Sequence, residues 1–319
     1  MSVAANPQVT AVLTTYRPKY DYLALAIESA LAQSVPVQVL VSDSGGDDAV
    51  RNFVLRYGDR VWYRRNATAV GPAENHRHAI ADVRTPYLAL LGHDDLWESD
   101  FLGTLVPELD AHPECILAFS DHWLVDSTGR VDHALTNRMS AHWGRTGLQE
   151  GVIRDVTALL MAQTVPVAMA ALLRTTAAQR HPIPDLSGPA YDLWLHYALA
   201  SEQQPYWYSP RRLTQWRFHG GAGTSEGNPD WYRGSAFTWD EVSADPLFAT
   251  GHRIAHRRAA VAWLSLAKSL LRRGVPVAEV QVAAENAMAR DPSLQARFAL
   301  RAPRLLRWLL AAHDVVRRA

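Results

Sequence analysis

Short apolar runs alternate with helical patterns through the first third of the chain, and several of these runs end in polar residues. The runs cover residues 9–14, 37–43, 60–65 and 87–92, and apolar residues recur at helical spacing between them. Strands that alternate with helices predict a parallel sheet with right-handed crossovers. Because ligands bind beyond the carboxyl ends of such strands, we expect a binding site where the runs end.

Three of the predicted strand ends carry side chains suited to a ligand. They are Thr14-Thr15-Tyr16, Ser42-Asp43-Ser44 and His93-Asp94-Asp95. A buried carboxylate costs several kcal/mol unless it is paired, protonated or bound to a cation. The adjacent acids Asp94 and Asp95 therefore predict a cation or a polar partner at this edge. The alternative is that the two acids cap a helix beginning near Glu98, whose dipole they would stabilise.

Chain length and cysteine content limit the fold class and the cellular compartment that we expect for this protein. A chain of 319 residues holds one large α/β domain with an appendage, or two modest domains. The single cysteine, Cys115, excludes a disulfide framework, and the chain does not open with a secretory pattern, so we expect a cytoplasmic protein. Residues 156–173 carry no charge, but the central Pro166 predicts a helix, a turn and a buried strand rather than a membrane span.

Charge is distributed unevenly along a chain whose net charge is zero. From Gly251 onward there are nine more basic than acidic side chains, and this stretch has helical patterns. The last predicted helix, after Pro303, places Leu305 and Trp308 among arginines. Such a basic amphipathic helix packs on its own protein or on a second copy, and the alternative is peripheral contact with the inner face of the membrane. We expect no nucleic-acid partner.

Six segments follow one another between residues 8 and 225. They are VTAVLTTYRPKYDYLALAIESALAQS, VQVLVSDSGGDD, GPAENHRHAI, PYLALLGHDDLWESDFL, YDLWLHYAL and QWRFHGGAGTS. In this order they resemble the signatures of the inverting family-2 glycosyltransferases. The resemblance implies a GT-A fold, a mixed α/β sheet flanked by helices, over residues 1–225. Its nucleotide-binding half would be 1–112 and its acceptor half 113–225, followed by a mostly helical extension at 226–319.

The resemblance implies a divalent cation, Mn²⁺ or Mg²⁺, to neutralise the departing nucleoside diphosphate. Asp95 resembles the metal-coordinating aspartate of the family, and Asp94 resembles the aspartate that reaches the ribose and the sugar of the donor. The family pattern has a further acid two positions before Asp94, where this chain has Gly92. His219 would complete the metal shell or contact the diphosphate, and the alternative is a structural histidine.

The resemblance also implies a nucleotide pocket. Asp43 matches the position that accepts the N3 proton of uracil or thymine, which favours a UDP- or TDP-sugar over a cytidine donor. Tyr16 resembles the residue that lies against the base, where stacking stabilises binding. Arg77 stands where the family more often has asparagine, and its guanidinium would assist the diphosphate. The remaining predicted nucleotide contacts are Thr14, Thr15 and Asn75.

Inversion at the anomeric carbon needs a base that takes the proton of the acceptor hydroxyl. Asp192 corresponds to the second acid of a Glu-Asp pair in the family, and Tyr191 replaces the glutamate. The resemblance therefore implies that Asp192 is the catalytic base. The alternative is a solvent-facing acid on a helix.

These features together predict a glycosyltransferase of the hexosyltransferase class. It would move a sugar from a UDP- or TDP-sugar to a hydroxyl group of a saccharide, a lipid carrier or a small natural product. Three alternatives stay open at this point. The first is a sugar-nucleotide pyrophosphorylase, although the chain has no glycine- and arginine-rich N-terminal loop. The second is a catalytically silent nucleotide-sugar-binding protein. The third is a scaffold protein that binds its partner through the basic C-terminal helices.

Overall fold

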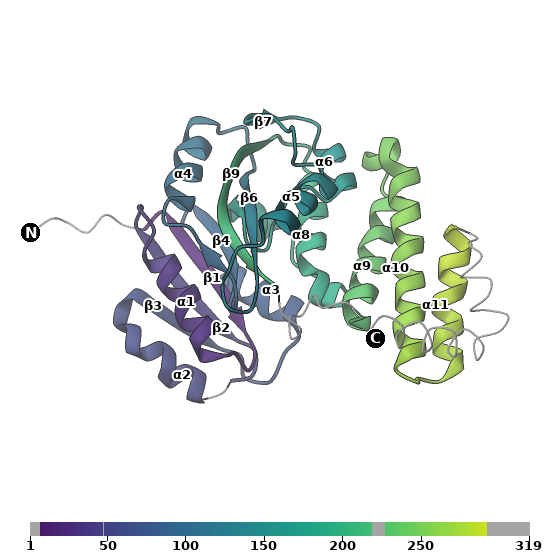
Figure 1. Ribbon diagram of the computed structural model, residues 1–319, viewed down its shortest axis with the longest axis horizontal. Coiled ribbons are helices and arrows are strands. Elements are labelled where there is room, and N and C mark those ends of the chain that lie inside the picture. Colours follow the sequence, from purple (N-terminus) through teal and green to yellow (C-terminus); the bar gives the residue numbers. More distant parts are fainter. Residues whose placement is uncertain (1–6, 47, 219–226, 292–319) are drawn as a thin grey trace, which may run out of the picture. The chain divides into compact units, whose positions relative to one another are not determined.

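The computed structural model describes residues 7–46, 48–218 and 227–291 of the chain (Figure 1). The chain divides into two compact units. The first holds the residues up to 185 together with 191–220, and the second holds residues 186–190 and the chain from 221 onward. The predicted change from sheet to helices at residue 225 falls close to this division, in a segment outside the described residues.

One mixed sheet forms the centre of the first unit. Within the described residues it has nine strands in the order β3-β2-β1-β4-β8-β6-β9-β5, with β7 paired to β9. Strands β1 to β4 are parallel, as their alternation with helices predicted, whereas β8 lies antiparallel to both β4 and β6. Strands β6 and β9 run parallel, and β5 and β7 lie antiparallel to β9. The bounds are β1 Val9–Thr15, β2 Val37–Asp43, β3 Val61–Arg65, β4 Tyr87–Gly92, β5 Leu96–Trp97, β6 Leu117–Val125, β7 Gly151–Ile153, β8 Ala171–Arg174 and β9 Tyr206–Arg217.

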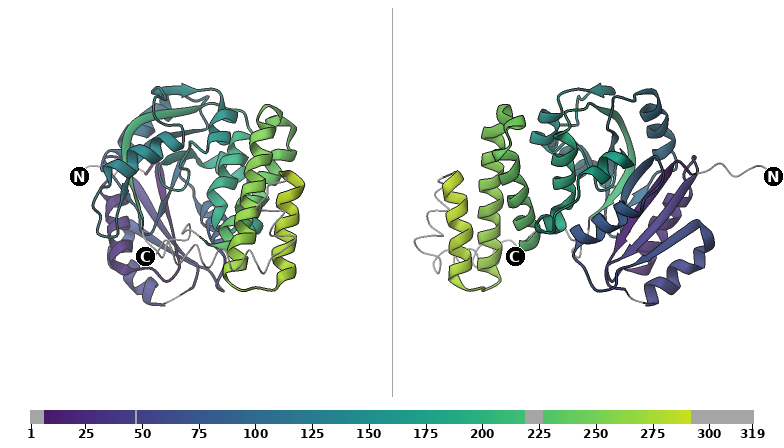
Figure 2. Two further views of the ribbon diagram at one scale, coloured as in Figure 1. Left: turned by 45° about the vertical axis from the view of Figure 1, so that its right-hand side comes forward. Right: turned by 180° about the vertical axis from the view of Figure 1, so that it is seen from behind.

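Helices cover both faces of this sheet (Figure 2). Helix α1 shows why the sequence folds this way, because its buried residues recur at intervals of three, one and three and pack on the strands. The helices of the first unit are α1 Tyr20–Leu31, α2 Asp48–Val54, α3 Pro72–Asp82, α4 Phe101–Ala111, α5 His133–His142, α6 Val156–Ala162, α7 Thr175–Arg180 and α8 Tyr191–Ala200. Short 3₁₀ turns cover Leu55–Arg60 and Asp185–Ala190.

The uncharged stretch 156–173 folds as predicted. Helix α6 ends at Gln163, whose backbone is left-handed at φ 54°, and after a turn the chain enters the buried strand β8. Among the described helices, none has the length and apolar character needed to span a membrane.

The second unit is helical over the residues that the structure describes, 227–291, as the sequence pattern predicted. Helices α9 Pro229–Ala244, α10 His252–Arg272 and α11 Val277–Arg290 pack side by side, and a 3₁₀ turn, Pro246–Gly251, joins the first two (Figure 1). Gly234 of α9 is required by close packing, because a Cβ atom there would lie 1.9 Å from the carbonyl oxygen of Ser187. The predicted basic helix after Pro303 lies outside the described residues.

Candidate active site

The strand register brings three polar strand ends to one edge of the sheet. Thr14 of β1 pairs with Ser42 of β2 on one side and with Gly92 of β4 on the other. The segments that follow these strands therefore begin side by side, as the sequence led us to expect. We call this edge, residues 14–16, 42–45 and 92–95, the strand-end site.

Arg217, at the end of β9, holds the two adjacent acids in place. Its backbone N–H donates a hydrogen bond to Oδ1 of Asp95 at 2.9 Å, and its Nε donates to the carbonyl oxygen of Asp94 at 2.8 Å. A third bond runs from Nη1 of Arg217 to the carbonyl oxygen of Asp126 at 3.2 Å. Asp95 is only 8% exposed. Strand β9 thus orients the Asp95 carboxylate and holds the backbone of Asp94.

Gly92 makes room for the same two carboxylates. A Cβ atom at this position would lie 2.6 Å from Oδ2 of Asp95 and 3.0 Å from Oδ1 of Asp94. A side chain at position 92 would therefore require the Asp95 carboxylate to shift from the arrangement seen here.

Burial and the neighbouring charge of Asp94 raise the pKa of the Asp95 carboxyl well above its usual value, and the Arg217 backbone N–H opposes this shift. A divalent cation would reverse it, because cations favour the ionised carboxylate and prefer oxygen ligands. Within the described residues no group of three or more His, Cys, Asp or Glu side chains could hold a metal ion. Carboxylate oxygens are the ligand type that Mg²⁺ and Mn²⁺ prefer, and Asp94 and Asp95 supply this type at the strand-end site.

Asp43 ends β2 with a buried carboxylate, 1% exposed. Its Oδ1 accepts a hydrogen bond from the backbone N–H of Gly45 at 2.9 Å, and its Oδ2 accepts one from the Tyr63 hydroxyl at 2.9 Å. Burial and this bond to Asp43 raise the pKa of Tyr63, so the phenol stays protonated and remains a donor. The carboxylate is thereby oriented before any ligand arrives.

Tyr16 lies beside Asp43 with 52% of its surface exposed. A Cβ atom built on Gly45 would lie 3.5 Å from the Tyr16 ring, and the Arg17 guanidinium lies 5.1 Å from the ring centroid. The ring is accessible for stacking. Thr15 differs, because its hydroxyl is buried and has no hydrogen-bond partner among the described residues.

His76 of α3 connects Thr14 to α8. Its Nδ1 lies 2.8 Å from the carbonyl oxygen of Pro72, and its Nε2 lies 3.0 Å from the Thr14 hydroxyl oxygen. Burial lowers the pKa of His76 to about 4, so the ring is neutral at physiological pH. Because the carbonyl can only accept, Nδ1 carries the proton and Nε2 accepts from Thr14. The ring stacks on Tyr191, with centroids 3.6 Å apart and planes at 21°.

Asp192 follows Tyr191 in the first turn of α8. Burial raises the pKa of the Asp192 carboxyl, against the effect of the Leu193 backbone N–H. Burial also raises the pKa of Tyr191, with further contributions from the charges of Asp192, Asp95 and Asp94. The phenol therefore lies within electrostatic reach of the strand-end site. A carboxylate with a raised pKa is suited to accept a proton.

A family model described as "Glycosyl transferase family 2" matches residues 10–153, which include β1 to β7. This stretch of the chain is similar to a family-2 glycosyltransferase domain. Succinoglycan biosynthesis protein ExoU of Rhizobium meliloti is 31% identical over 109 residues, which make up 33% of this chain and 32% of that protein. The protein y4gI of Sinorhizobium fredii is 32% identical over 123 residues, 36% of this chain and 13% of that protein. The chain thus spans less than a third of the length of these curated relatives.

Solved structures extend the likeness of fold beyond the matched domain. TarS 1–349 of S. aureus in complex with UDP-GlcNAc has a TM-score of 0.63 at 14% identity, covering 93% of this chain and 92% of that chain. The mannosyltransferase PcManGT of Pyrobaculum calidifontis, in complex with GDP-Man and Mn²⁺, has a TM-score of 0.58 at 16% identity, covering 97% and 86%. The chain therefore has a GT-A-like fold.

Two of the residues predicted to contact the nucleotide, Asn75 and Arg77, form hydrogen bonds within the protein. Asn75 is buried, and its Oδ1 accepts from the Ser42 hydroxyl at 2.7 Å and from Asn66 at 2.8 Å. This arrangement ties α3 to β2 and β3 below the strand-end site. The Arg77 guanidinium donates to the carbonyl oxygen of Ile183 at 2.7 Å and to Asp185 at 2.6 Å. His219 lies outside the described residues.

The structure adds residues that sequence reasoning missed. Tyr63 reaches Asp43 because β3 pairs with β2, and Arg217 reaches Asp95 across 122 positions of sequence. His76 was given no role in the sequence analysis, yet it bridges Thr14 and Tyr191. The one available sequence signal was that Arg217 belongs to the last motif, QWRFHGGAGTS.

Proposed function

We propose that this chain is a metal-dependent, inverting family-2 glycosyltransferase, and that it transfers a sugar from a UDP- or TDP-sugar to a hydroxyl group of its acceptor. The proposal rests on Asp43, which ends β2 with a buried carboxylate, and on the adjacent acids Asp94 and Asp95 after β4, which lie at one edge of the sheet. Tyr191, which precedes Asp192, stacks on His76, and His76 lies within hydrogen-bond distance of Thr14 at the same edge. A base-binding carboxylate, a phosphate-facing pair and a proton acceptor are the three groups that the reaction needs.

Donor choice rests on Asp43. The ionised carboxylate has only acceptor atoms, so it favours a base that turns an N–H toward it over one that presents a lone pair. The imide N3–H of uracil or thymine supplies that donor, whereas cytosine presents an unprotonated N3. The exposed ring of Tyr16 supplies a face on which the base stacks.

Asp95, together with Asp94, would hold Mn²⁺ or Mg²⁺. When bound, the cation stabilises the negative charge that develops on the leaving diphosphate. PcManGT binds Mn²⁺ beside GDP-Man, which supports a cation in this fold. The chain's own contribution is the clamp from Arg217, which keeps Oδ1 of Asp95 occupied at 2.9 Å.

Asp192 would take the proton of the acceptor hydroxyl as its oxygen attacks the anomeric carbon. The new carbon–oxygen bond forms on one face of the sugar while the bond to the diphosphate breaks on the other, and the electron pair leaves with the diphosphate. The raised pKa of Asp192 brings its basicity closer to that of a useful proton acceptor. Tyr191, held by His76, orients the turn that carries Asp192.

The proposal extends to the compartment and the acceptor class. Cys115 is buried and unpaired, and burial raises the pKa of its thiol to about 11, which fits a protein of the reducing cytoplasm. The acceptor is a saccharide, a lipid carrier or a small natural product, and the basic C-terminal helices would mediate dimerisation or contact with the inner membrane face.

A thermal-shift titration with UDP, TDP and CDP, each with and without Mn²⁺, tests the donor assignment. A ligand at 100 times its Kd stabilises the folded state by about 2.7 kcal/mol. We expect UDP or TDP with Mn²⁺ to raise Tm, and CDP to have little effect. In Asp43→Asn the UDP affinity should fall about tenfold. Equal shifts for CDP and UDP, or an unchanged Asp43→Asn response, would contradict the assignment.

A further inference from the structure

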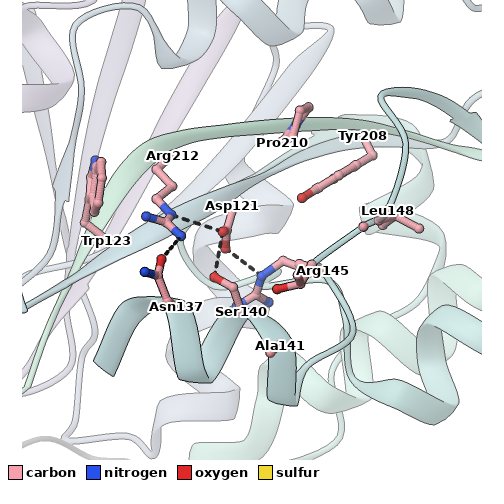
Figure 3. A pocket seen from close by; sticks show the side chains of 12 residues that line it. Asp121, Trp123, Asn137, Ser140, Ala141, Arg145, Leu148, Tyr208, Pro210 and Arg212 are labelled. Atoms are coloured by element: carbon pink, nitrogen blue, oxygen red, sulfur yellow. Dashed lines mark hydrogen bonds and ion pairs between the residues drawn. The ribbon is translucent and has the colours of Figure 1, made fainter. Parts of the chain in front are cut away.

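A cavity around Asp121 in the first unit shares no residue with the strand-end site (Figure 3). It has a volume of about 560 Å³, which is within the range of small-molecule sites. Strands β6 and β9 form its floor, α5 forms one wall, and the loop at 145–148 forms another. None of the residues assigned to the donor, the cation or the base lines this cavity.

The cavity contains one more positive charge than negative charge. Its only lining residues with side chains that are charged at neutral pH are Asp121, Arg145 and Arg212. Arg145 Nε lies 2.7 Å from Asp121 Oδ1, and Arg212 Nε lies 3.3 Å from Asp121 Oδ2. Burial opposes ionisation of Asp121, but Arg145 and the Ser140 hydroxyl outweigh burial and lower its pKa. Two guanidinium groups therefore face one carboxylate.

Hydrogen-bond donors remain unused around this excess charge. One terminal nitrogen of Arg145 is buried with no hydrogen-bond partner among the described residues. Arg212 donates one hydrogen bond from Nε to Asp121 and one from Nη2 to Asn137 at 2.6 Å. Its other terminal nitrogen has no hydrogen-bond partner among the described residues. Its side chain is 23% exposed, and Figure 3 shows the Tyr208 hydroxyl directed toward the same space.

The walls of the cavity combine these donors with aromatic surface. Trp123 lies against Arg212, with the guanidinium carbon 4.6 Å from the ring centroid, and this contact fixes the plane of the guanidinium. Tyr208, Leu148 and Pro210 supply further apolar surface. A planar guanidinium beside an aromatic face suits a ligand that has both a carboxylate or phosphate and an apolar ring face.

We propose that this cavity binds an acidic sugar, through a carboxylate or phosphate group that pairs with Arg212. The anion would balance the excess charge of the two guanidinium groups. Two sources share this chemistry, an acidic group on the acceptor and a free acidic sugar that acts as an effector. Binding in this cavity does not depend on the proposed transfer reaction, so the two proposals can fail separately.

Isothermal titration calorimetry with methyl β-D-glucuronide and with glucose 6-phosphate tests the proposal, and methyl β-D-glucoside is the neutral control. We expect both acidic probes to bind the full chain, and the neutral glucoside to bind at least about tenfold more weakly, because a charge-assisted bond is lost. Arg212→Gln should weaken the acidic probes by a similar factor. The matched variant Arg138→Gln removes an exposed arginine of α5 that does not line the cavity, and it should bind as the wild type does.

Arg212→Lys is a second variant that keeps the positive charge but loses the planar, bidentate guanidinium. We expect its affinity for the acidic probes to lie between those of the wild type and Arg212→Gln. Similar affinity for the glucoside and the glucuronide would overturn the proposal, as would an equal loss in Arg138→Gln, displacement of the probes by UDP with Mn²⁺, or no binding of either acidic probe. Incubation with a donor sugar then separates the sources. An acceptor becomes glycosylated, whereas an effector is recovered unchanged and alters donor turnover, and either result supports the site.

Discussion

Gly92→Ala tests the geometry of the carboxylate pair at its tightest point. The added methyl would lie 2.6 Å from Oδ2 of Asp95, and ordinary contacts begin at about 3.4 Å. The carboxylate must therefore move by about 0.8 Å, and a misplacement of 1 Å at a reacting centre costs about a hundredfold in rate. We expect kcat/KM with the physiological donor to fall by roughly one to two orders of magnitude, and the Mn²⁺ concentration for half-activation to rise.

Gly71→Ala is the matched control for this substitution. Gly71 precedes α3, and a Cβ atom there meets nothing within 4 Å. Both variants should melt within a few degrees of the wild type, because neither backbone position requires a positive φ. The assay is initial-rate kinetics across a Mn²⁺ series. If Gly92→Ala keeps kcat/KM and its Mn²⁺ requirement within threefold of the wild type, the pair does not hold the cation in the way described.

The remaining predictions concern the base, its support and the buried acid. Asp192→Asn should keep the UDP affinity, measured by calorimetry, unchanged, while the rate of sugar transfer, measured by product formation, falls by about a hundredfold or more. A turnover within threefold of the wild type would remove Asp192 from the mechanism. Tyr191→Leu loses the stack on His76, so kcat should fall about tenfold with donor KM nearly constant, whereas Tyr191→Phe keeps the stack and should behave as the wild type in the same assay. Burial and Asp94 raise the pKa of Asp95 above 3.8, so the folded chain binds this proton more tightly than the unfolded chain, and stability declines as pH rises from about 4 toward the raised pKa. In metal-free buffer at pH 8, calorimetry should therefore give Asp95→Asn a higher Tm than the wild type, with a smaller difference near pH 4, and a lower Tm at pH 8 would refute the buried-charge account.

The strand-end site could be predicted because its parts follow from local patterns. Each apolar run marks a strand, and the polar residues where the run stops mark its carboxyl end, so Asp43, Asp94 and Asp95 could be assigned before the sheet was seen. Parallel pairing then brings the ends together without further information. The helical character of residues 252–290 followed from periodicity in the same way.

The support of the site could not be predicted, because it depends on contacts between distant parts of the chain. The orientation of Asp95 depends on Arg217, and the position of Tyr191 depends on a ring stack with His76 of α3. Arg77 shows the opposite case, since its guanidinium bonds to Ile183 and Asp185, which the linear motif gave no reason to expect. The cavity around Asp121 likewise depends on irregular strand pairing, because the register of β6 and β9 shifts at this residue. At such a shift the side chains no longer point to alternate faces of the sheet, so their direction cannot be predicted from the sequence.

A crystal of the full chain soaked with UDP and Mn²⁺, with data collected at the manganese absorption edge, tests the central claim most directly. The account predicts an anomalous peak in coordination contact with the Asp95 carboxylate and with a diphosphate oxygen, and uracil N3 within hydrogen-bond distance of Asp43. A peak away from Asp95, or a uracil ring bound without contact to Asp43, would contradict it.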